Sequence, residues 1–521
     1  MSWSSIAAAV GLAVGCALAS RVLLHYDQLE SYQFRGYFRS LRRNLRRAVL
    51  PGVILCAGAL LLWLCLRGTS WGGFAAGPVL VALGWAVQKL TRPKQEKKKF
   101  AVTARVKRLF AALILVLLAA CLLTPEDWRW PIPLLLPLWV ALAKAVAWPV
   151  ERGIYELYFQ SARRILKARP DLIKIGITGS FGKTSVKFIL NTLLSEEYQV
   201  LATPASFNTP MGLTRVIRER LRPAHRIFLA EMGARHRGDI RELCRLVHPD
   251  HGVLTSVGAQ HLDTFGTLER IIETKYDLIR AIPAEGIRFF PDDGDICRRL
   301  YDRTDGEKRL ASLTRTQGAD VWAENIAVSA RGSSFDLCTA DGGRAACETK
   351  LLGAHNIQNI LLAASVCLAL GMTLRQVSRG IARLEPVEHR LQLIERPGGI
   401  TLIDDAFNAN PAGASRALDV LKAFPPRRII VTPGMVELGA REAEYNRRFG
   451  EQMASSADIA ILVGPRHTAP IREGLLAAGF PEKEIRTVQS LTEAAEVMRT
   501  LAVPGDTVLF ENDLPDNYSE T

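Results

Sequence analysis

A glycine-rich segment that ends in lysine and hydroxyl residues is the part of the sequence best suited to chemistry. Residues 178–185 read Thr-Gly-Ser-Phe-Gly-Lys-Thr-Ser. Glycines let backbone N–H groups face phosphate oxygens at the start of a helix, and the Lys183 ammonium can reach the β- and γ-phosphates. The Thr184 hydroxyl can ligate Mg²⁺. Ile177 replaces the first glycine of the usual pattern, so the segment predicts nucleoside triphosphate binding without naming a reaction.

Further polar segments follow the glycine-rich one, mostly at expected strand ends and helix starts. They are residues 208–212, 231–234, 260–263, 353–359, 388–392 and 404–411. A carboxylate at a strand end, as at Glu231, would face the phosphates and a metal ion. Lys275 lies in a segment with helical spacing, residues 269–279, downstream of His261.

In this order, the segments resemble the Mur ligase family, most closely its D-alanyl-D-alanine-adding branch. The resemblance covers about residues 171–511. Members are ATP-dependent amide ligases of peptidoglycan-precursor synthesis, so the resemblance implies ATP, two Mg²⁺ ions, a cell-wall precursor and an amino acid or dipeptide amine as ligands.

The resemblance also implies a role for each matching residue. Nucleotide contacts fall on Gly179, Ser180, Gly182, Lys183, Thr184, Ser185, Asn356, Asn359, Arg390 and Asp405. Metal contacts fall on Thr184, Glu231, His261 and Lys275, the last as a carbamylated lysine. The catalytic positions are Lys183, Lys275, Arg390 and Asn408. Without the resemblance, His261 would be interpreted as a loop histidine and Lys275 as a solvated lysine. Glu437 also matches a family motif, but that segment is interpreted as structural.

The elements that must position these residues alternate between strand and helix. Strands are expected at residues 171–178, 226–231, 252–256 and 287–290, and a second series at 401–404, 428–432, 459–463, 486–488 and 507–510. Such alternation favours mostly parallel sheets covered by helices. We therefore predict a P-loop-type central ATPase domain at residues 171–389 and a C-terminal Rossmann-like domain at 390–521.

The first 150 residues are expected to form an α-helical membrane domain. Of the 521 residues, 48% are hydrophobic, and the net charge is +14. Residues 1–170 carry 24 Lys and Arg against 7 Asp and Glu, so the basic excess lies among apolar runs and does not indicate nucleic-acid binding. Five spans are expected, at residues 6–24, 49–66, 71–87, 109–123 and 132–150, followed by a juxtamembrane linker at 151–170.

Loop charges predict how these spans are oriented. The loops after the first and third spans are rich in Arg and Lys, so the positive-inside rule places them in the cytoplasm. The N-terminus is then outside and the ligase domains are cytoplasmic, as in an integral protein of the bacterial inner membrane. A signal peptide is less favoured, because residues 1–5 carry no positive charge. The basic residues 39–47 either orient the protein and contact membrane lipids or hold a pyrophosphate head group.

The membrane domain stands where the muropeptide ligases have a soluble domain that grips the UDP-sugar. This exchange motivates the hypothesis that the acceptor is membrane-associated, for example polyprenyl-linked. Differences from the family in the C-terminal domain leave the amine open. Alternatives are a glutamate-adding ligase of the folyl or poly-γ-glutamate kind, an ATP-driven transporter, and a catalytically silent scaffold for other membrane proteins of wall synthesis.

Overall fold

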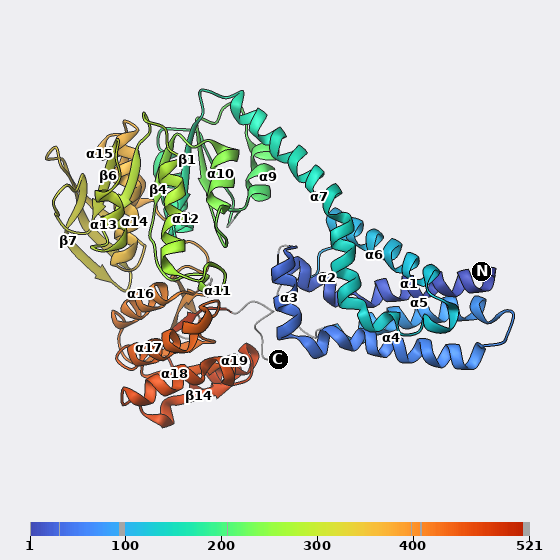
Figure 1. The fold of residues 1–521 in the computed structure, drawn as a ribbon. Coiled ribbons are helices and arrows are strands. Elements are labelled where there is room, and N and C mark those ends of the chain that lie inside the picture. The colour runs from blue at the N-terminus through green and yellow to red at the C-terminus, as the bar shows by residue number, and fades with distance from the viewer. Residues whose placement is uncertain are drawn as a thin grey trace. The chain divides into compact units, whose positions relative to one another are not determined.

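The protein forms two compact units. The computed structural model describes residues 2–30, 32–92, 99–205, 207–396, 399–406 and 409–513. The first unit contains the described residues up to Glu156, and the second begins at Leu157. Figure 1 labels their elements, and each unit is described by itself below.

The first unit is entirely helical in its described part. Its elements are α1 (Trp3–Ala19), α2 (Arg21–Leu29), α3 (Phe34–Arg43), α4 (Leu45–Leu66), α5 (Gly72–Leu90), α6 (Ala104–Leu123), η1 (Glu126–Trp128), η2 (Ile132–Leu135) and α7 (Leu136–Lys167). By length and composition, α4, α5, α6 and the stretch Ile132–Lys167 could each cross a membrane. The pair α1 and α2, bent by 43°, makes a fifth candidate if it counts as one span. These helices overlap the five stretches expected as spans, although several are longer than expected.

Small residues let the helices of the first unit approach closely. A Cβ added to Gly11 of α1 would lie 2.3 Å from the Gly77 Cα of α5, and one added to Gly15 would lie 2.4 Å from the Leu80 carbonyl oxygen. Helices α1, α4, α5 and α6 therefore lie side by side with little space between α1 and α5 (Figure 1). Such glycine-mediated contact is typical of helix packing in membranes, where side-chain burial gives no hydrophobic gain.

An ion pair is buried in the first unit. Lys144 on α7 bonds to Asp27 on α2, with side-chain exposures of 5% and 0%. The Lys144 ammonium also lies 4.5 Å from the Phe34 ring centroid and 5.0 Å from that of Tyr37. Helix α7 continues without a break to Lys167, so most of the segment expected as a linker is helical.

The central domain of the second unit is built on a nine-stranded sheet. Its strands are β1 (Ile173–Thr178), β2 (Val200–Ala202), β3 (Ile227–Glu231), β4 (His251–Leu254), β5 (Arg288–Pro291), β6 (Lys308–Ser312), β7 (Val321–Ser329), β8 (Gly332–Thr339) and β9 (Arg344–Thr349). Its helices are α8 (Lys183–Leu194), α9 (Pro210–Arg220), α10 (Asp239–Val247), α11 (Leu262–Phe265), α12 (Leu268–Arg280), α13 (Ile296–Asp302), α14 (Ala354–Ala369) and α15 (Leu374–Ala382). The strand order is β2-β3-β1-β4-β5-β6-β7-β8-β9, parallel as far as β7.

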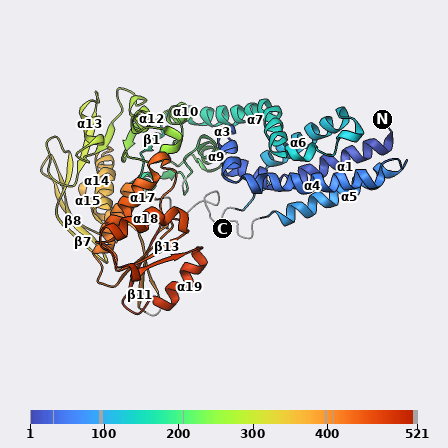
Figure 2. The ribbon, with the colours of Figure 1, turned by 60° about the horizontal axis from the view of Figure 1, so that its bottom comes forward.

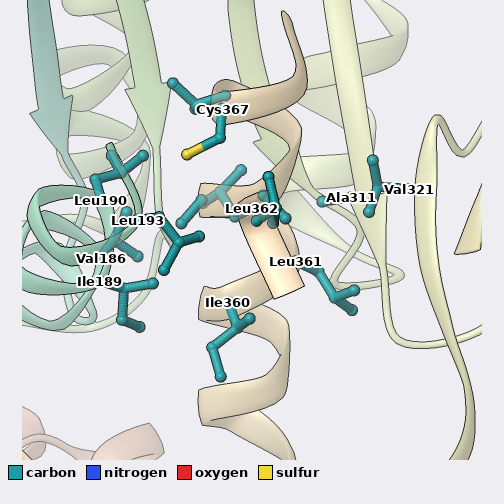
Figure 3. Packing of buried hydrophobic residues seen from close by; sticks show 14 of the residues in the cluster. Val186, Ile189, Leu190, Leu193, Ala311, Val321, Ile360, Leu361, Leu362 and Cys367 are labelled. Atoms are coloured by element: carbon teal, nitrogen blue, oxygen red, sulfur yellow. The ribbon is translucent and has the colours of Figure 1, made fainter. Parts of the chain in front are cut away.

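Helix α14 fills the core of this domain. Its apolar residues pack toward α8 on one side and toward β6 and β7 on the other (Figure 3). Leu361 and Cys367 of α14 and Leu190 and Leu193 of α8 are fully buried. Since α8 begins at the end of the glycine-rich segment, this packing holds that segment against the sheet.

The C-terminal domain contains a six-stranded sheet with helices on both faces. Its elements are β10 (Gln392–Arg396), β11 (Ile400–Asp405), α16 (Pro411–Lys422), β12 (Arg428–Thr432), η3 (Gly439–Arg441), α17 (Glu442–Met453), β13 (Ile459–Val463), α18 (Pro465–Ala477), η4 (Glu482–Glu484), β14 (Ile485–Val488), α19 (Leu491–Leu501) and β15 (Thr507–Glu511). Alternate strand residues face opposite sides: Ile430 packs with α16 to α18, whereas Ile429 and Val431 pack with α19. Figure 2 shows α17 and α18 together near β13 and α19 apart from them.

The sheets are mostly parallel, as predicted, but the sequence analysis missed the parallel strands β2 and β6 as well as the antiparallel additions. Strands β7, β8 and β9 form an antiparallel meander at one edge of the central sheet. Strand β10 pairs antiparallel with β11 at the edge of the second sheet, next to the expected domain boundary. All nine expected strands are present, with ends that differ by no more than two residues.

Candidate active site

The glycine-rich segment connects β1 to α8 at the carboxyl edge of the central sheet. Gly182 has φ +79° and precedes the first residue of α8, a left-handed conformation that favours glycine. A Cβ on Gly179 would lie 2.1 Å from the Thr255 hydroxyl oxygen, so only glycine fits there. Ser180 is buried and donates its hydroxyl hydrogen to the Gly258 carbonyl oxygen at 2.9 Å. Ser185 lies in the first turn of α8, half-buried.

The Lys183 side chain folds back onto this segment. Its ammonium donates to the carbonyl oxygens of Gly179 at 2.6 Å and Ser180 at 3.1 Å. Burial, together with the positive charge of Arg390, lowers the pKa of Lys183 to about 8, whereas Glu231 acts in the opposite direction. A phosphate group would replace the carbonyl oxygens as partner and would favour the charged form.

Glu231, at the end of β3, is the centre of a buried polar cluster. Its two carboxylate oxygens each accept the Thr184 hydroxyl at 3.1 Å, and its side chain is 1% exposed. Lys187 bonds to the same carboxylate at 3.0 Å, and the Asn208 amide donates to it at 3.1 Å. A hydroxyl beside a carboxylate at the start of a phosphate-binding helix fits Mg²⁺, which takes oxygen ligands.

His261 and Lys275 complete the predicted metal-binding set on the adjacent elements. His261 precedes α11 with φ +54°, and Lys275 lies on α12 with 2% of its surface exposed. Burial holds the pKa of Lys275 well below its usual value, and the nearby Lys183 charge lowers it further. A lowered pKa favours carbamylation of an amine, because the neutral form attacks CO₂. Among the described residues, no three His, Cys, Asp or Glu side chains gather as a ready metal site.

Glu437 contacts this set from the C-terminal domain. Its carboxylate bonds to Nδ1 of His261, and its other oxygen lies 3.7 Å from the Arg235 guanidinium. The Glu437 carbonyl oxygen accepts the Asp263 backbone N–H at 3.3 Å. Glu437 itself has φ +64°, an unfavourable conformation for a residue with a Cβ. The interpretation of this segment as structural alone is therefore incomplete: the side chain touches a predicted metal ligand.

A cavity of about 630 Å³ lies between the two domains of the second unit. The central domain contributes Phe181, Asn359 and His355 to its lining, and the C-terminal domain contributes Arg416 and Val420. The Arg416 guanidinium lies 4.7 Å from the Phe181 ring centroid. Burial, reinforced by Arg416, lowers the pKa of His355 to about 3, so its ring is neutral at physiological pH. A volume in this range is typical of small-molecule and cofactor pockets.

The remaining predicted residues surround the cavity and the cluster. Asn359 lines the cavity, and its amide points to Asn356 at 3.5 Å, while Asn356 donates to the Leu352 carbonyl oxygen at 2.9 Å. Arg390 is half-buried; burial lowers its pKa, whereas the charges of Asp405 and Glu231 favour its ionised form. Burial raises the pKa of Asp405 to about 6, and one of its oxygens accepts the Leu391 backbone N–H at 3.2 Å.

Most of the residues predicted from the sequence thus come together. Around the glycine-rich segment, the structure brings together Gly179, Ser180, Gly182, Lys183, Thr184, Ser185, Glu231, His261, Lys275 and Arg390. Nearby lie Asn356, Asn359 and Asp405. Asn408 lies outside the described residues. Sequence reasoning missed Lys187 and Arg416. The position of Lys187, one helical turn after Lys183, is the only signal that pointed to it.

Two family models match the chain. The Mur ligase middle domain matches residues 177–367, and the Mur ligase glutamate ligase domain matches residues 389–511. The UDP-N-acetylmuramoyl-tripeptide–D-alanyl-D-alanine ligase of Mycobacterium tuberculosis is 31% identical, over 65% of this chain and 69% of its own length. The ligase of the same name from Escherichia coli is 30% identical, over 64% of this chain and 73% of its own length.

Solved structures agree with these relatives. A MurF structure from Acinetobacter baumannii covers 70% of this chain and 79% of its own, with TM-score 0.63 and 25% identity. The MurF ligase of Thermotoga maritima, solved in complex with ADP, covers 70% of this chain and 82% of its own, with TM-score 0.61 and 27% identity. These relatives thus match the greater part of this chain in sequence and fold, and the chain belongs to the Mur ligase family.

Proposed function

We propose that this ATP-dependent Mur-type ligase of peptidoglycan synthesis works anchored in the bacterial cytoplasmic membrane, on a wall precursor carried by a lipid. The observation that carries the proposal is the first unit, whose α4, α5, α6 and α7 are long and apolar enough to span a bilayer. Large apolar side chains on these helices point outward, among them Leu61, Leu115 and Trp148, each at least 60% exposed. Lipid would cover such a surface, whereas its exposure to water would cost free energy.

The charges of the loops indicate on which side of the membrane the ligase domains would lie. The Arg- and Lys-rich loops after the first and third expected spans favour a cytoplasmic position, and the chain then leaves its last span in the cytoplasm, where ATP is available. The N-terminus would lie outside. This orientation supports a ligase that meets its acceptor at the inner leaflet.

The first chemical step makes the substrate carboxylate reactive. A carboxylate resists an amine because oxide is a poor leaving group, so its oxygen attacks the γ-phosphorus of ATP, giving an acyl phosphate and ADP. Lys183 and the backbone N–H groups of residues 179–184 would hold the transferred phosphoryl group, and Arg390 would reach it from the domain boundary. Two Mg²⁺ ions, held by Thr184, Glu231, His261 and the Lys275 carbamate, would neutralise charge between phosphoryl group and carboxylate.

The second step forms the amide. The amine nitrogen attacks the acyl carbon, the tetrahedral intermediate expels inorganic phosphate, and the nitrogen loses a proton. Water would hydrolyse the acyl phosphate, so the two domains must exclude it. The contact between Glu437 and His261 joins the two domains, as does that between Arg416 and Phe181 in the wall of the cavity, and both support such exclusion.

The relatives' name indicates the chemical class of the amine. The M. tuberculosis and E. coli relatives are both named UDP-N-acetylmuramoyl-tripeptide–D-alanyl-D-alanine ligase, a name that gives D-alanyl-D-alanine as the amine and a muramoyl tripeptide as the acceptor. We extend this to a dipeptide amine here, with a muramoyl-peptide carboxylate as acceptor. Folylpolyglutamate synthase of M. tuberculosis is 18% identical with TM-score 0.53, a likeness of fold alone.

Reconstitution distinguishes the lipid-linked from the soluble acceptor. Full-length protein in liposomes receives ATP, Mg²⁺ and D-alanyl-D-alanine with either a polyprenyl-linked or a UDP-linked muramoyl tripeptide, and products are identified by mass spectrometry. We expect ligation of the lipid-linked acceptor, and none in the Lys183→Ala variant. Turnover with the UDP-linked acceptor alone would remove the lipid-linked part of the proposal.

A further inference from the structure

The first unit contains a second cavity, of about 260 Å³. Its walls come from α1, α2, the end of α5 and the start of α6, and they are apolar at Leu18, Leu24, Val106 and Phe110. A water molecule takes up about 30 Å³ in the liquid. By that measure the cavity is large enough for a phosphate group and the first part of one hydrocarbon chain.

Positive charge is concentrated at this cavity. Arg21 and Lys107 contribute to its lining, and no Asp or Glu is among the described residues that form it. The Arg21 guanidinium lies 5.1 Å from the Phe100 ring centroid, and the Gln88 amide adds a hydrogen-bonding group. An apolar cavity whose described lining includes two cations and no Asp or Glu suits a molecule with an anionic head and a hydrocarbon tail.

The wall near Phe100 is held in place before any ligand arrives. The Gln28 side-chain amide donates to the Ala101 carbonyl oxygen at 2.9 Å, and its oxygen accepts the Ala101 N–H at 3.1 Å. The Thr103 hydroxyl accepts the Val106 N–H at 3.2 Å and caps α6. The segment 100–103 therefore joins α2 to α6, and a preformed cavity loses less entropy when it binds.

The membrane level of the cavity also fits an anionic head group. Gln88 lies near the end of α5 and Lys107 in the first turns of α6, on either side of a loop that charge places in the cytoplasm. Cations just inside the cytoplasmic face are typical of sites for lipid phosphates.

We propose that this cavity binds the head of a single-chain lipid phosphate, such as a prenyl phosphate or diphosphate. The two cations match a head with about two negative charges, the charge of a phosphate monoester at neutral pH, whereas a glycerophospholipid diester carries one phosphate charge and two chains. The inference rests on the lipid-linked acceptor proposed above and assigns that lipid a place.

Binding of farnesyl phosphate tests the site directly. Full-length protein in a non-ionic detergent, without ATP, is titrated with farnesyl phosphate, and bound lipid is counted by native mass spectrometry. We expect one molecule per chain in the wild type and at least tenfold weaker binding in an Arg21→Gln/Lys107→Gln variant. Val102→Trp, at an exposed lining residue, should block the cavity without removing a charge.

Control variants and ligands make the result specific. Arg42→Gln/Arg46→Gln removes two exposed cations of α3 and α4 and should leave binding within twofold. Farnesol tests the need for the anion, and inorganic phosphate tests the need for the chain; both should bind far more weakly. The proposal is wrong if the Arg42/Arg46 variant loses binding while the Arg21/Lys107 variant keeps it, or if liposomes of phosphatidylglycerol compete as well as farnesyl phosphate.

The binding result is independent of the ligase assay. If farnesyl phosphate binds as expected but only UDP-linked acceptor is ligated, the acceptor proposal fails and the site remains. If lipid-linked acceptor is ligated equally by wild type and the Arg21/Lys107 variant, and farnesyl phosphate binding is also unchanged, the site fails and the acceptor proposal remains.

Discussion

The imidazole of His261 bonds through Nδ1 to the carboxylate of Glu437, 176 positions later in the chain. The contact joins the central domain to the C-terminal domain, and a backbone bond from Asp263 to the Glu437 carbonyl oxygen lies beside it. A carboxylate on one ring nitrogen fixes the orientation of a histidine and leaves the other nitrogen for a metal. Glu437 is therefore placed to position a predicted metal ligand only when the domains meet.

Replacing Glu437 should weaken metal use without unfolding the protein. We expect Glu437→Gln to lower kcat by about 10- to 100-fold, the range for partners of metal-binding histidines, and to raise the Mg²⁺ concentration needed for half-maximal rate. Glu437→Asp should recover part of the loss. Glu451→Gln, an exposed carboxylate on α17, is the matched control. An unchanged Mg²⁺ dependence would show that Glu437 only joins the domains.

Lys183→Ala should abolish turnover while leaving the fold intact. Its ammonium bonds only to carbonyl oxygens of its own segment among the contacts described, so its removal breaks no distant packing. Losing a preorganised cation at the transferred phosphoryl group costs about 100- to 1000-fold in rate. Product formation and the unfolding temperature are measured together, with Lys422→Ala on α16 as control. Residual turnover within tenfold of wild type would contradict the role of Lys183.

Activity should depend on dissolved CO₂ if Lys275 is carbamylated. Removing CO₂ and bicarbonate from the assay should lower the rate, and adding bicarbonate should restore it. Lys275→Arg cannot form the carbamate and should be inactive with or without bicarbonate. Mass spectrometry under gentle conditions should show the added CO₂ on the wild type alone. An enzyme insensitive to bicarbonate, with no added mass, would exclude the carbamate.

The buried carboxyl of Glu511 should make the protein less stable as the pH rises. Burial, with the nearby Asp405 charge, raises the pKa of Glu511 from 4.5 to about 8, and the Thr432 hydroxyl donates to it at 3.0 Å. As the pH rises, the unfolded chain loses this proton first. The stability from the protonated group is therefore complete below pH 4.5 and falls until about pH 8, by up to about 1.4 kcal/mol per pH unit.

The comparison with Glu511→Gln isolates this effect. The amide cannot ionise, so the variant should be more stable than wild type at pH 8 and close to it at pH 5. Urea unfolding of full-length protein at several pH values, followed by tryptophan fluorescence, gives the difference in the free energy of unfolding between the two proteins. Parallel pH curves for the two proteins would mean that Glu511 is already ionised in the folded state.

The pair formed by Lys144 and Asp27 should be far more sensitive to single than to double substitution. Removing one partner leaves a buried charge, which typically costs about 3–5 kcal/mol. We expect Asp27→Asn to lower the unfolding temperature of the detergent-solubilised protein strongly. Asp27→Leu with Lys144→Met removes both charges and should recover most of the loss. If the double variant is as unstable as the single one, packing around the pair matters more than its charge.

The sequence pattern was sufficient to predict most parallel strands of both sheets, but not the parallel strands β2 and β6 or the antiparallel edges. Strands such as β1 and β3 are short apolar runs buried on both faces, a pattern that composition alone reveals. Strand β7 is different: its first three residues are buried and its last five are exposed, so it lacks the two-residue alternation that marks a strand. The meander that it begins depends on pairing with β8 and β9, which no local pattern encodes.

The candidate site, like the sheets, could be predicted from the sequence only in part. Lys183 and Thr184 lie in one short segment whose spacing predicts phosphate binding without a structure. Glu437 and Arg416 reach the site only because the C-terminal domain folds against the central one. Partners so distant in the chain leave no trace in local spacing, and the family motif around Glu437 was the only available signal.

The cavity walled by Phe181 from one domain and Arg416 from the other has a consequence for the life of the protein in the cell. A nucleotide bound in this cavity would contact both domains, and at a concentration of 100 times its Kd it would add about 2.7 kcal/mol to the stability of the folded form. A fall in ATP concentration would remove this added stability, and the unfolded form that proteases cleave would be populated more often.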